Sequence, residues 1–142
     1  MIPSVNILTE EITETTYPNN TYKIVIKHDP YADATKAVDR ISGYVDDLDS
    51  VKQAVYLILN TERYQFPIYS WDYGVELVDL FGKPMPYVMS ELPRRIKEAL
   101  IQDNRIEDVV DFEFETNGNK LHTTFTVVTT LGNLNTELEV TI

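Results

Sequence analysis

The sequence contains no cysteine in its 142 residues. This absence excludes a disulfide framework, a metal site built on thiolates and a cysteine nucleophile. The two histidines, His28 and His122, are far apart and match no ligand spacing such as HExxH. We therefore predict no metal site and no cofactor, and we expect both histidines at the surface. A chain of this length can bury a complete hydrophobic core without such supports.

Basic residues are scarce as well. Only 12 lysines and arginines stand against 23 acidic residues, which gives a formal net charge of −11. Because binding to nucleic acid depends on basic side chains that release counterions from phosphates, we predict no nucleic-acid partner. No apolar run reaches the roughly 18 residues of a membrane-spanning helix, and the first residues lack the basic segment of a signal peptide. We therefore expect a soluble protein that is not conventionally secreted and has no membrane partner.

Motifs of common catalytic sites are also missing: the sequence has no GxSxG, P-loop or GxGxxG pattern. Glycoside hydrolysis needs only two carboxylates at a suitable separation, so a peptidoglycan-degrading, lysozyme-like hydrolase stays open as an alternative. Glu62 would be its first candidate acid, but Arg63 beside it favours the charged carboxylate and opposes a general-acid role. We predict no catalytic residue and a protein that is not an enzyme.

The N-terminal part is expected to combine an arm with one or two strands. Residues 1–20 hold few large apolar side chains, which favours an extended arm, either loosely ordered or paired as a strand with a neighbouring subunit. Alternating apolar residues predict a strand over 22–28, and a short strand near 38–41 is expected to end in a turn at Ser42-Gly43. Residues 21–142 are predicted to form a single domain.

Two main helices are predicted from apolar residues spaced three and four positions apart. The first starts with Ser50 as its N-cap, and Gln53 completes a capping box. Pro93 lies within the second, over residues 86–102, and predicts either a kink or a new helix that starts near Ser90. The expected buried faces are Val51, Ala54, Val55, Ile58 and Leu59 in the first helix, and Leu92, Ile96, Ala99 and Leu100 in the second, opposite Arg94, Arg95, Lys97 and Glu98. Residues 75–81 are expected to add one or two helical turns.

The C-terminal third predicts a three-stranded antiparallel meander. Val110, Phe112 and Phe114 alternate with acidic residues, and Asn117-Gly118-Asn119 is a strong hairpin signal. The return strand has Leu121, Thr123, Phe125 and Val127 on one face, and a last strand covers residues 134–142. Together with the strand at Tyr22, the meander is expected to form an antiparallel or mixed sheet with the two main helices packed on one face. The predicted fold class is α+β.

Aromatic residues gather over positions 64–73, as Tyr64, Phe66, Tyr69, Trp71 and Tyr73. This segment is expected to be either a short hairpin or an irregular ordered loop. Because so many aromatic side chains exceed what a small core absorbs, we expect Trp71 and Tyr73 to face a partner rather than the core.

Two interpretations are open for the preceding Glu62-Arg63 pair. In one, Arg63 bonds carbonyl groups of the loop and Glu62 bonds backbone N–H groups, which holds the loop against the core. In the other, one of the two side chains crosses an interface, where arginine is enriched.

Three stretches of this chain resemble a known family. They are Gln53–Gly74 (QAVYLILNTERYQFPIYSWDYG), Ile41–Asp47 (ISGYVDD) and Gln102–Ile106 (QDNRI). In this order they resemble the XkdS-like group of small baseplate proteins from contractile-tailed bacteriophages. That group is similar to a wider family of sheath initiators, often labelled lysozyme, which includes a baseplate wedge protein of phage T4. The wider family has a Glu-Pro-Arg motif where this chain reads Asp103-Asn104-Arg105, so Arg105 alone matches directly.

The resemblance implies a structural protein in the baseplate of a phage tail or tail-like particle that assembles in the bacterial host cytoplasm. By this resemblance the protein joins inner wedge and hub proteins to the first ring of the tail sheath, in six copies per baseplate because such tails have sixfold symmetry. Its expected partner-binding residues are Glu62, Arg63, Trp71, Tyr73, Asp103 and Arg105, together with edge strands at both termini. An adaptor domain unrelated to tails is a further alternative.

Overall fold

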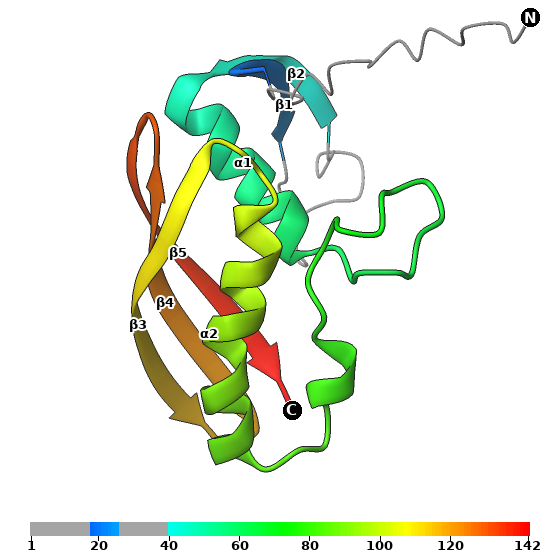
Figure 1. The fold of residues 1–142 in the computed structure, drawn as a ribbon, viewed down its shortest axis with the longest axis vertical. Coiled ribbons are helices and arrows are strands. Elements are labelled where there is room, and N and C mark those ends of the chain that lie inside the picture. Colours follow the sequence, from blue (N-terminus) through cyan, green and yellow to red (C-terminus); the bar gives the residue numbers. More distant parts are fainter. Residues whose placement is uncertain (1–17, 26–39) are drawn as a thin grey trace, which may run out of the picture.

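The computed structural model describes residues 18–25 and 40–142, which form an α+β fold (Figure 1). Strands β3, β4 and β5 form an antiparallel sheet in that order, and α1 and α2 pack on one of its faces. This arrangement confirms the predicted fold class, the C-terminal meander and the two main helices. The elements are β1 (Asn20–Val25), β2 (Arg40–Asp46), α1 (Asp47–Leu59), the 3-10 helix η1 (Val78–Leu80), α2 (Met85–Ile101), β3 (Ile106–Asn117), β4 (Lys120–Thr129) and β5 (Gly132–Thr141).

Some predictions concern residues outside the described ranges. These are the arm over positions 1–17, the end of the first strand beyond Val25, and the surface position of His28. Within the described ranges, no helix is long and apolar enough to span a membrane.

Strands β1 and β2 form a small antiparallel sheet of their own. The expectation that the strand at Tyr22 joins the meander is therefore wrong. The turn expected at Ser42-Gly43 is instead a bulge inside β2, since Tyr22 and Ile24 pair with Tyr44 and Ile41. Gly43 has a φ of +73° at this bulge, a conformation that glycine adopts without steric cost.

Helix α1 starts one turn earlier than predicted, at Asp47. Ser50 is not its N-cap, because its hydroxyl lies inside the first turn and donates a hydrogen bond to the Asp47 carbonyl at 2.8 Å. Acidic Asp47 and Asp49 suit this first turn, where the helix dipole favours negative charge. Gln53 does not complete a capping box either. Its amide accepts a hydrogen bond from Ile24 N–H at 2.9 Å and donates one to the Tyr22 carbonyl at 2.8 Å, so that it fastens β1 to the helix.

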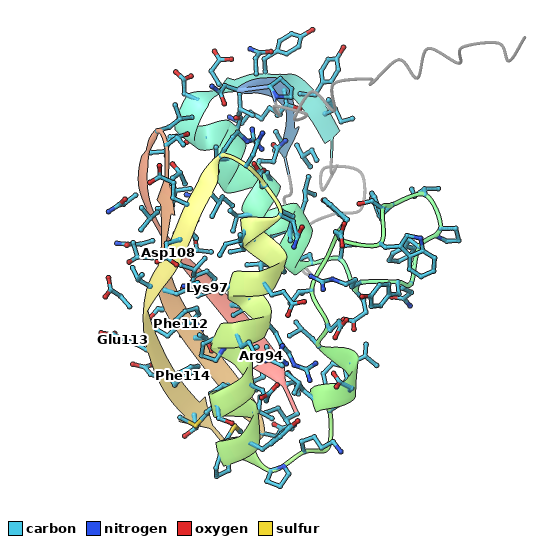
Figure 2. All side chains as sticks on the ribbon, viewed as in Figure 1. Arg94, Lys97, Asp108, Phe112, Glu113 and Phe114 are labelled. Atoms are coloured by element: carbon cyan, nitrogen blue, oxygen red, sulfur yellow. The ribbon has the colours of Figure 1, made fainter. Side chains whose placement is uncertain are left out.

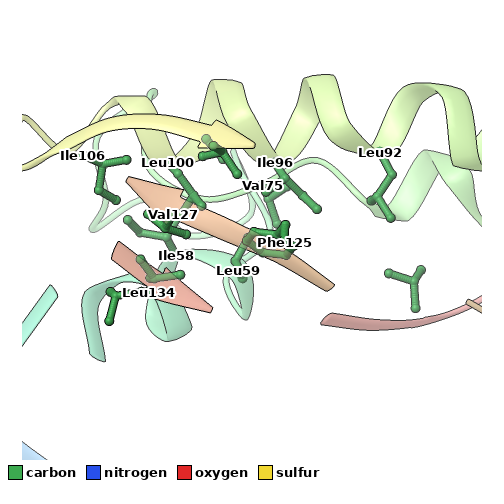
Figure 3. Packing of buried hydrophobic residues seen from close by; sticks show 14 of the residues in the cluster. Ile58, Leu59, Val75, Leu92, Ile96, Leu100, Ile106, Phe125, Val127 and Leu134 are labelled. Carbon is green, nitrogen blue, oxygen red and sulfur yellow. The ribbon is translucent and has the colours of Figure 1, made fainter. Parts of the chain in front are cut away.

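Helix α2 continues through Pro93 from Met85 to Ile101, so no new helix starts at Ser90. A proline removes one helical hydrogen bond, and the buried face on both sides of it keeps the helix in place. The predicted apolar faces of both helices lie in one core, which also includes side chains from the sheet (Figure 3). Ala54 is the exception, since it is only partly buried and does not belong to this core.

Strand β3 of the meander differs from the predicted regular strand. The expected hairpin turn is present, with Gly118 and Asn119 between paired Asn117 and Lys120. However, the register shifts between Val110 and Glu113, and this bulge changes which side chains face the core. Val109 is buried before the bulge, whereas Phe112 within the bulge stacks on core residue Phe125. Val110 therefore does not share a face with Phe112, contrary to the simple alternation. The predicted core face of β4 is confirmed.

Candidate functional site

The segment between α1 and η1 is an irregular loop that projects from the rest of the domain (Figure 1). Its two ends are joined by backbone hydrogen bonds from Arg63 N–H to the Val75 carbonyl at 3.1 Å and from Val75 N–H to the Thr61 carbonyl at 3.0 Å. Gly74 closes the loop with a φ of +99°, and a Cβ atom there would lie 2.6 Å from the Thr61 carbonyl oxygen. Only glycine fits this position. We call residues 64–73 the aromatic loop.

Glu62 fixes the end of the loop that leads into η1. Its carboxylate accepts hydrogen bonds from Leu77 N–H at 3.1 Å and from Val78 N–H at 3.2 Å. These N–H groups lie at the start of a helical turn, where they lack partners within the turn. Both carboxylate oxygens of Glu62 therefore accept hydrogen bonds from backbone N–H groups, as in the interpretation in which Glu62 and Arg63 hold the loop against the core.

Arg63 holds the loop against α2. Its side chain is 7% exposed and donates to the Gly74 carbonyl at 3.2 Å and to Glu98 at 3.1 Å. Burial alone would lower the pKa of Arg63, but the hydrogen bonds of Glu98 and Tyr64 and the charges of Glu98 and Glu76 together outweigh it, and the pKa is raised. The interpretation in which Arg63 bonds a loop carbonyl is therefore confirmed, while a contact of Glu62 or Arg63 with a partner stays a prediction.

A second arginine, Arg95, anchors the same region and was missed in the sequence. It was expected on the solvent face of α2, but it is buried and donates to the Glu76 carbonyl at 2.9 Å and to the Asp79 carboxylate. The Arg95 guanidinium lowers the pKa of Asp79. The signal in the sequence was its position three residues after Leu92 on the buried face, which puts Arg95 at the border of the apolar stripe.

The aromatic loop itself exposes large apolar side chains. Trp71 is 79% exposed and Ile68 is 86% exposed. The rings of the loop contact one another. The ring centroids of Tyr64 and Trp71 lie 5.7 Å apart, and Tyr69 stacks on Tyr73 with the centroids 4.6 Å apart. Tyr73 packs partly against the core, whereas Trp71 points away from it. Of the two predicted partner residues, Trp71 is thus the one that presents most of its surface.

Asp103 and Arg105 lie in the connection between α2 and β3 and form a buried ion pair. Arg105, 8% exposed, donates to Asp103 through its Nε at 3.0 Å and through Nη2 at 2.7 Å. Its Nη1 donates to the Pro18 carbonyl at 2.9 Å and lies 3.4 Å from the Ser50 hydroxyl. Arg105 therefore ties the residues before β1 to the first turn of α1. Contact of this pair with a partner stays a prediction.

The two edge strands of the meander differ. In a hairpin with a two-residue loop, the flanking residues form a hydrogen-bonded pair, and bonded and non-bonded pairs then alternate. Thr129 and Gly132 flank such a loop, and the register of β5 with β4 is unbroken to Thr141. The N–H and C=O groups of Asn133, Asn135, Glu137 and Glu139 therefore point away from β4, to the free side of β5.

Edge strand β3 is protected by comparison. Two register shifts interrupt it, and Asp111 adopts a φ of +56° at the second. The outward N–H of Val109 donates to the Asp108 carboxylate at 2.8 Å, and Lys97 of α2 binds the same carboxylate at 2.6 Å (Figure 2). Bulges and charges at an edge hinder pairing with a further strand. Within the described residues, β5 is thus the meander's open edge.

An ordered, exposed aromatic loop and an open sheet edge define a protein that contacts other proteins in an assembly. The comparison with known families identifies that assembly. The chain belongs to the family described as contractile injection system sheath initiator, whose model matches residues 18–132. A similar protein is the phage-like element PBSX protein XkdS of Bacillus subtilis (strain 168), 42% identical over 96 residues that cover 66% of this chain and 68% of that protein.

Membership of this family confirms the resemblance found in the three sequence stretches. It gives the chain a structural role in a phage tail or related contractile particle, where it interacts with other tail or sheath components. The family is structural, in agreement with a protein that is not an enzyme.

Proposed function

We propose that this protein joins the inner wedge and hub proteins of a baseplate to the first ring of the tail sheath. A joining part needs two separate contact surfaces on one domain. The observation that supports the proposal is the presence of two such surfaces: the aromatic loop, and the free edge of β5. No residue of the aromatic loop belongs to the hollow that lies along β5, so the two surfaces consist of different residues.

In this proposal the aromatic loop docks on a baseplate protein through Trp71, with Tyr73 as the support beneath it. Exposed tryptophan is a frequent hot spot of protein interfaces, because it buries a large area with little loss of conformational freedom. Glu62 and Arg63 already hold the loop in the conformation that docks, so docking costs little conformational entropy. Asp103 and Arg105 contribute to the interface by holding the residues before β1 in position. Six copies of the protein surround the tail axis.

The proposal is tested by electron cryomicroscopy of intact tail particles from the source strain. We expect six copies between the baseplate hub and the first sheath ring, with the aromatic loop against a neighbouring chain. Absence of this domain from the particles would overturn the proposal. Copies located elsewhere in the particle would overturn the joining role.

A matched pair of variants adds a functional readout. Trp71→Ala should lower the yield of complete tails at least about tenfold, the loss expected for an interface anchor, while the melting temperature of the isolated protein stays the same. Tyr87→Ala removes an aromatic side chain of α2 that is also exposed, and it serves as the control with normal yield. A normal yield with Trp71→Ala would contradict docking through the aromatic loop.

A further inference from the structure

The backbone of Tyr64 adopts a conformation that is unusual for a bulky residue. The aromatic loop begins at Tyr64 with a φ of +66°, and Gly74 closes it with a φ of +99°. Glycine adopts such values without steric cost, whereas the Cβ atom of any other residue comes close to the following carbonyl oxygen. Strain of this kind persists only where the surrounding contacts impose it. The contacts of Tyr64 therefore have to offset the strain.

The core does not supply these contacts. Tyr64 is 60% exposed, so burial of its ring adds little to stability. Instead, the Cζ atom of Arg63 lies 6.0 Å from the centroid of the Tyr64 ring, a distance at which the face of the ring attracts a guanidinium. The ring of Trp71 lies 5.7 Å from the same centroid and is tilted by 48°. Tyr64 thus contacts both a buried cation and the exposed indole.

The five aromatic rings of the loop form two groups. Tyr69 contacts Phe66 at a centroid distance of 6.2 Å and stacks on Tyr73, and Tyr73 packs against the core. Trp71 does not belong to this group. Within the described part of the chain, the aromatic ring in contact with Trp71 is that of Tyr64. The orientation of Trp71 therefore depends on Tyr64 rather than on the rings that reach the core.

We propose that Tyr64 is a positioning residue that holds the indole of Trp71 in the exposed orientation in which it docks on a baseplate protein. With its left-handed backbone, the ring of Tyr64 reaches both Arg63 and Trp71. Arg63 is fixed in turn by the Gly74 carbonyl and by Glu98 of α2. The helix thereby sets the orientation of Trp71 through two intermediate side chains. This inference rests on the proposed docking of the aromatic loop and identifies what prepares the loop for it.

A fixed indole lowers the cost of docking. An exposed side chain otherwise changes rotamer within picoseconds to nanoseconds, and this freedom is lost in an interface. A residue that serves stability alone would lower the melting temperature when it is replaced. Replacing a strained positioning residue has a different result, because the strain is relieved while docking becomes weaker. Stability and assembly are therefore expected to respond differently to a change at Tyr64.

The test uses the fluorescence of Trp71, which is the single tryptophan of the chain. Tyr64→Asn and Tyr64→Phe are compared in the full-length protein. Asparagine tolerates the left-handed conformation but lacks the ring, whereas phenylalanine keeps the ring. We expect time-resolved anisotropy to show a larger nanosecond component in Tyr64→Asn and an unchanged decay in Tyr64→Phe. The melting temperature of Tyr64→Asn should equal that of the parent protein or exceed it.

The yield of complete tails provides the functional readout. Tyr64→Asn should lower it about three- to tenfold, the loss expected when docking has to immobilise one further side chain. Tyr64→Phe should restore the normal yield. Tyr87→Asn makes the same exchange at a half-exposed tyrosine of α2, and as the matched control it should change neither the anisotropy of Trp71 nor the yield.

Two results would overturn the inference directly. In one, the indole is as immobile in Tyr64→Asn as in the parent protein. In the other, the melting temperature of Tyr64→Asn falls, which would show that Tyr64 supports the fold of the loop rather than the orientation of Trp71.

Failure of this inference can be told from failure of the proposed function. If Trp71→Ala lowers the yield of tails and Tyr64→Asn does not, the docking role stands and the inference is wrong. If both variants give a normal yield while the anisotropy changes as described, the docking role is wrong, and Tyr64 still sets the orientation of Trp71.

Discussion

The two edges of the meander are built from strands of similar length, but they present different surfaces to solvent. Edge strand β3 contains two register shifts and five acidic residues, and Asp108 occupies one of its outward N–H groups. Edge strand β5 pairs with β4 without interruption, and no other strand among residues 18–25 and 40–142 pairs with its outward backbone groups. An unpaired edge invites association, and proteins normally protect it. With one edge protected, the other is the edge to which a further strand could add.

The largest effect on stability is expected from a proline that removes a hydrogen bond between β5 and β4, rather than an N–H on the free side of β5. Leu138→Pro removes the N–H that bonds β4 and also removes apolar packing, so we expect a loss of about 3 kcal/mol in the free energy of unfolding. Glu137→Pro removes only an outward N–H, and its loss should be about 1 kcal/mol or less. Urea unfolding followed by circular dichroism measures both. Equal losses would show that the assigned directions of the backbone groups are wrong.

The sequence predicted the strands and turns of the meander because period-two alternation and the Asn-Gly signal are local features. It did not predict the bulge at Asp111 and Phe112, because the apolar residues of this stretch are compatible both with a regular strand and with a strand that contains one inserted residue. It also assigned the strand at Tyr22 to the wrong sheet. Alternation indicates a strand, but the partner of β1 is set by nonlocal contacts such as the side chain of Gln53.

The aromatic loop was found from composition. Trp71 is exposed, while its contact with a partner stays a prediction. The anchoring role of Arg95 was missed, because a charged residue beside an apolar stripe is normally assigned to solvent. Its burial depends on the Glu76 carbonyl and on Asp79, which approach α2 only in the folded chain. The buried ion pair of Asp103 and Arg105, and the hydrogen bond from Arg105 to the Pro18 carbonyl, were not predicted either, while contact of these two residues with a partner stays a prediction.

A smaller effect is expected at the second bulge of β3. Asp111 has a φ of +56°, which a β-branched side chain tolerates poorly. Asp111→Val should therefore lower the free energy of unfolding by about 1–2 kcal/mol, whereas Asp111→Gly, which adopts this conformation freely, should leave it nearly unchanged. Thermal unfolding of the two variants provides the measurement. If Asp111→Val were as stable as the parent protein, the bulge would not depend on this backbone conformation, and β3 could straighten into an edge like β5.

The smallest expected effect concerns the charge that protects β3. The hydrogen bond from Lys97, followed by that from Val109 N–H, lowers the pKa of Asp108. A carboxyl group with a lowered pKa in the folded state contributes stability above its unfolded pKa of about 3.9, and this contribution is lost as the pH falls through the folded value. The stability difference between the parent protein and Asp108→Asn should thus be constant from pH 7 to about pH 5 and should shrink below about pH 4. Added salt should reduce it, because the pair is exposed and screened. A difference that persists unchanged at pH 2 would show that the amide at position 108 alters β3 for a reason other than charge, and the protection of this edge would then rest on its two bulges.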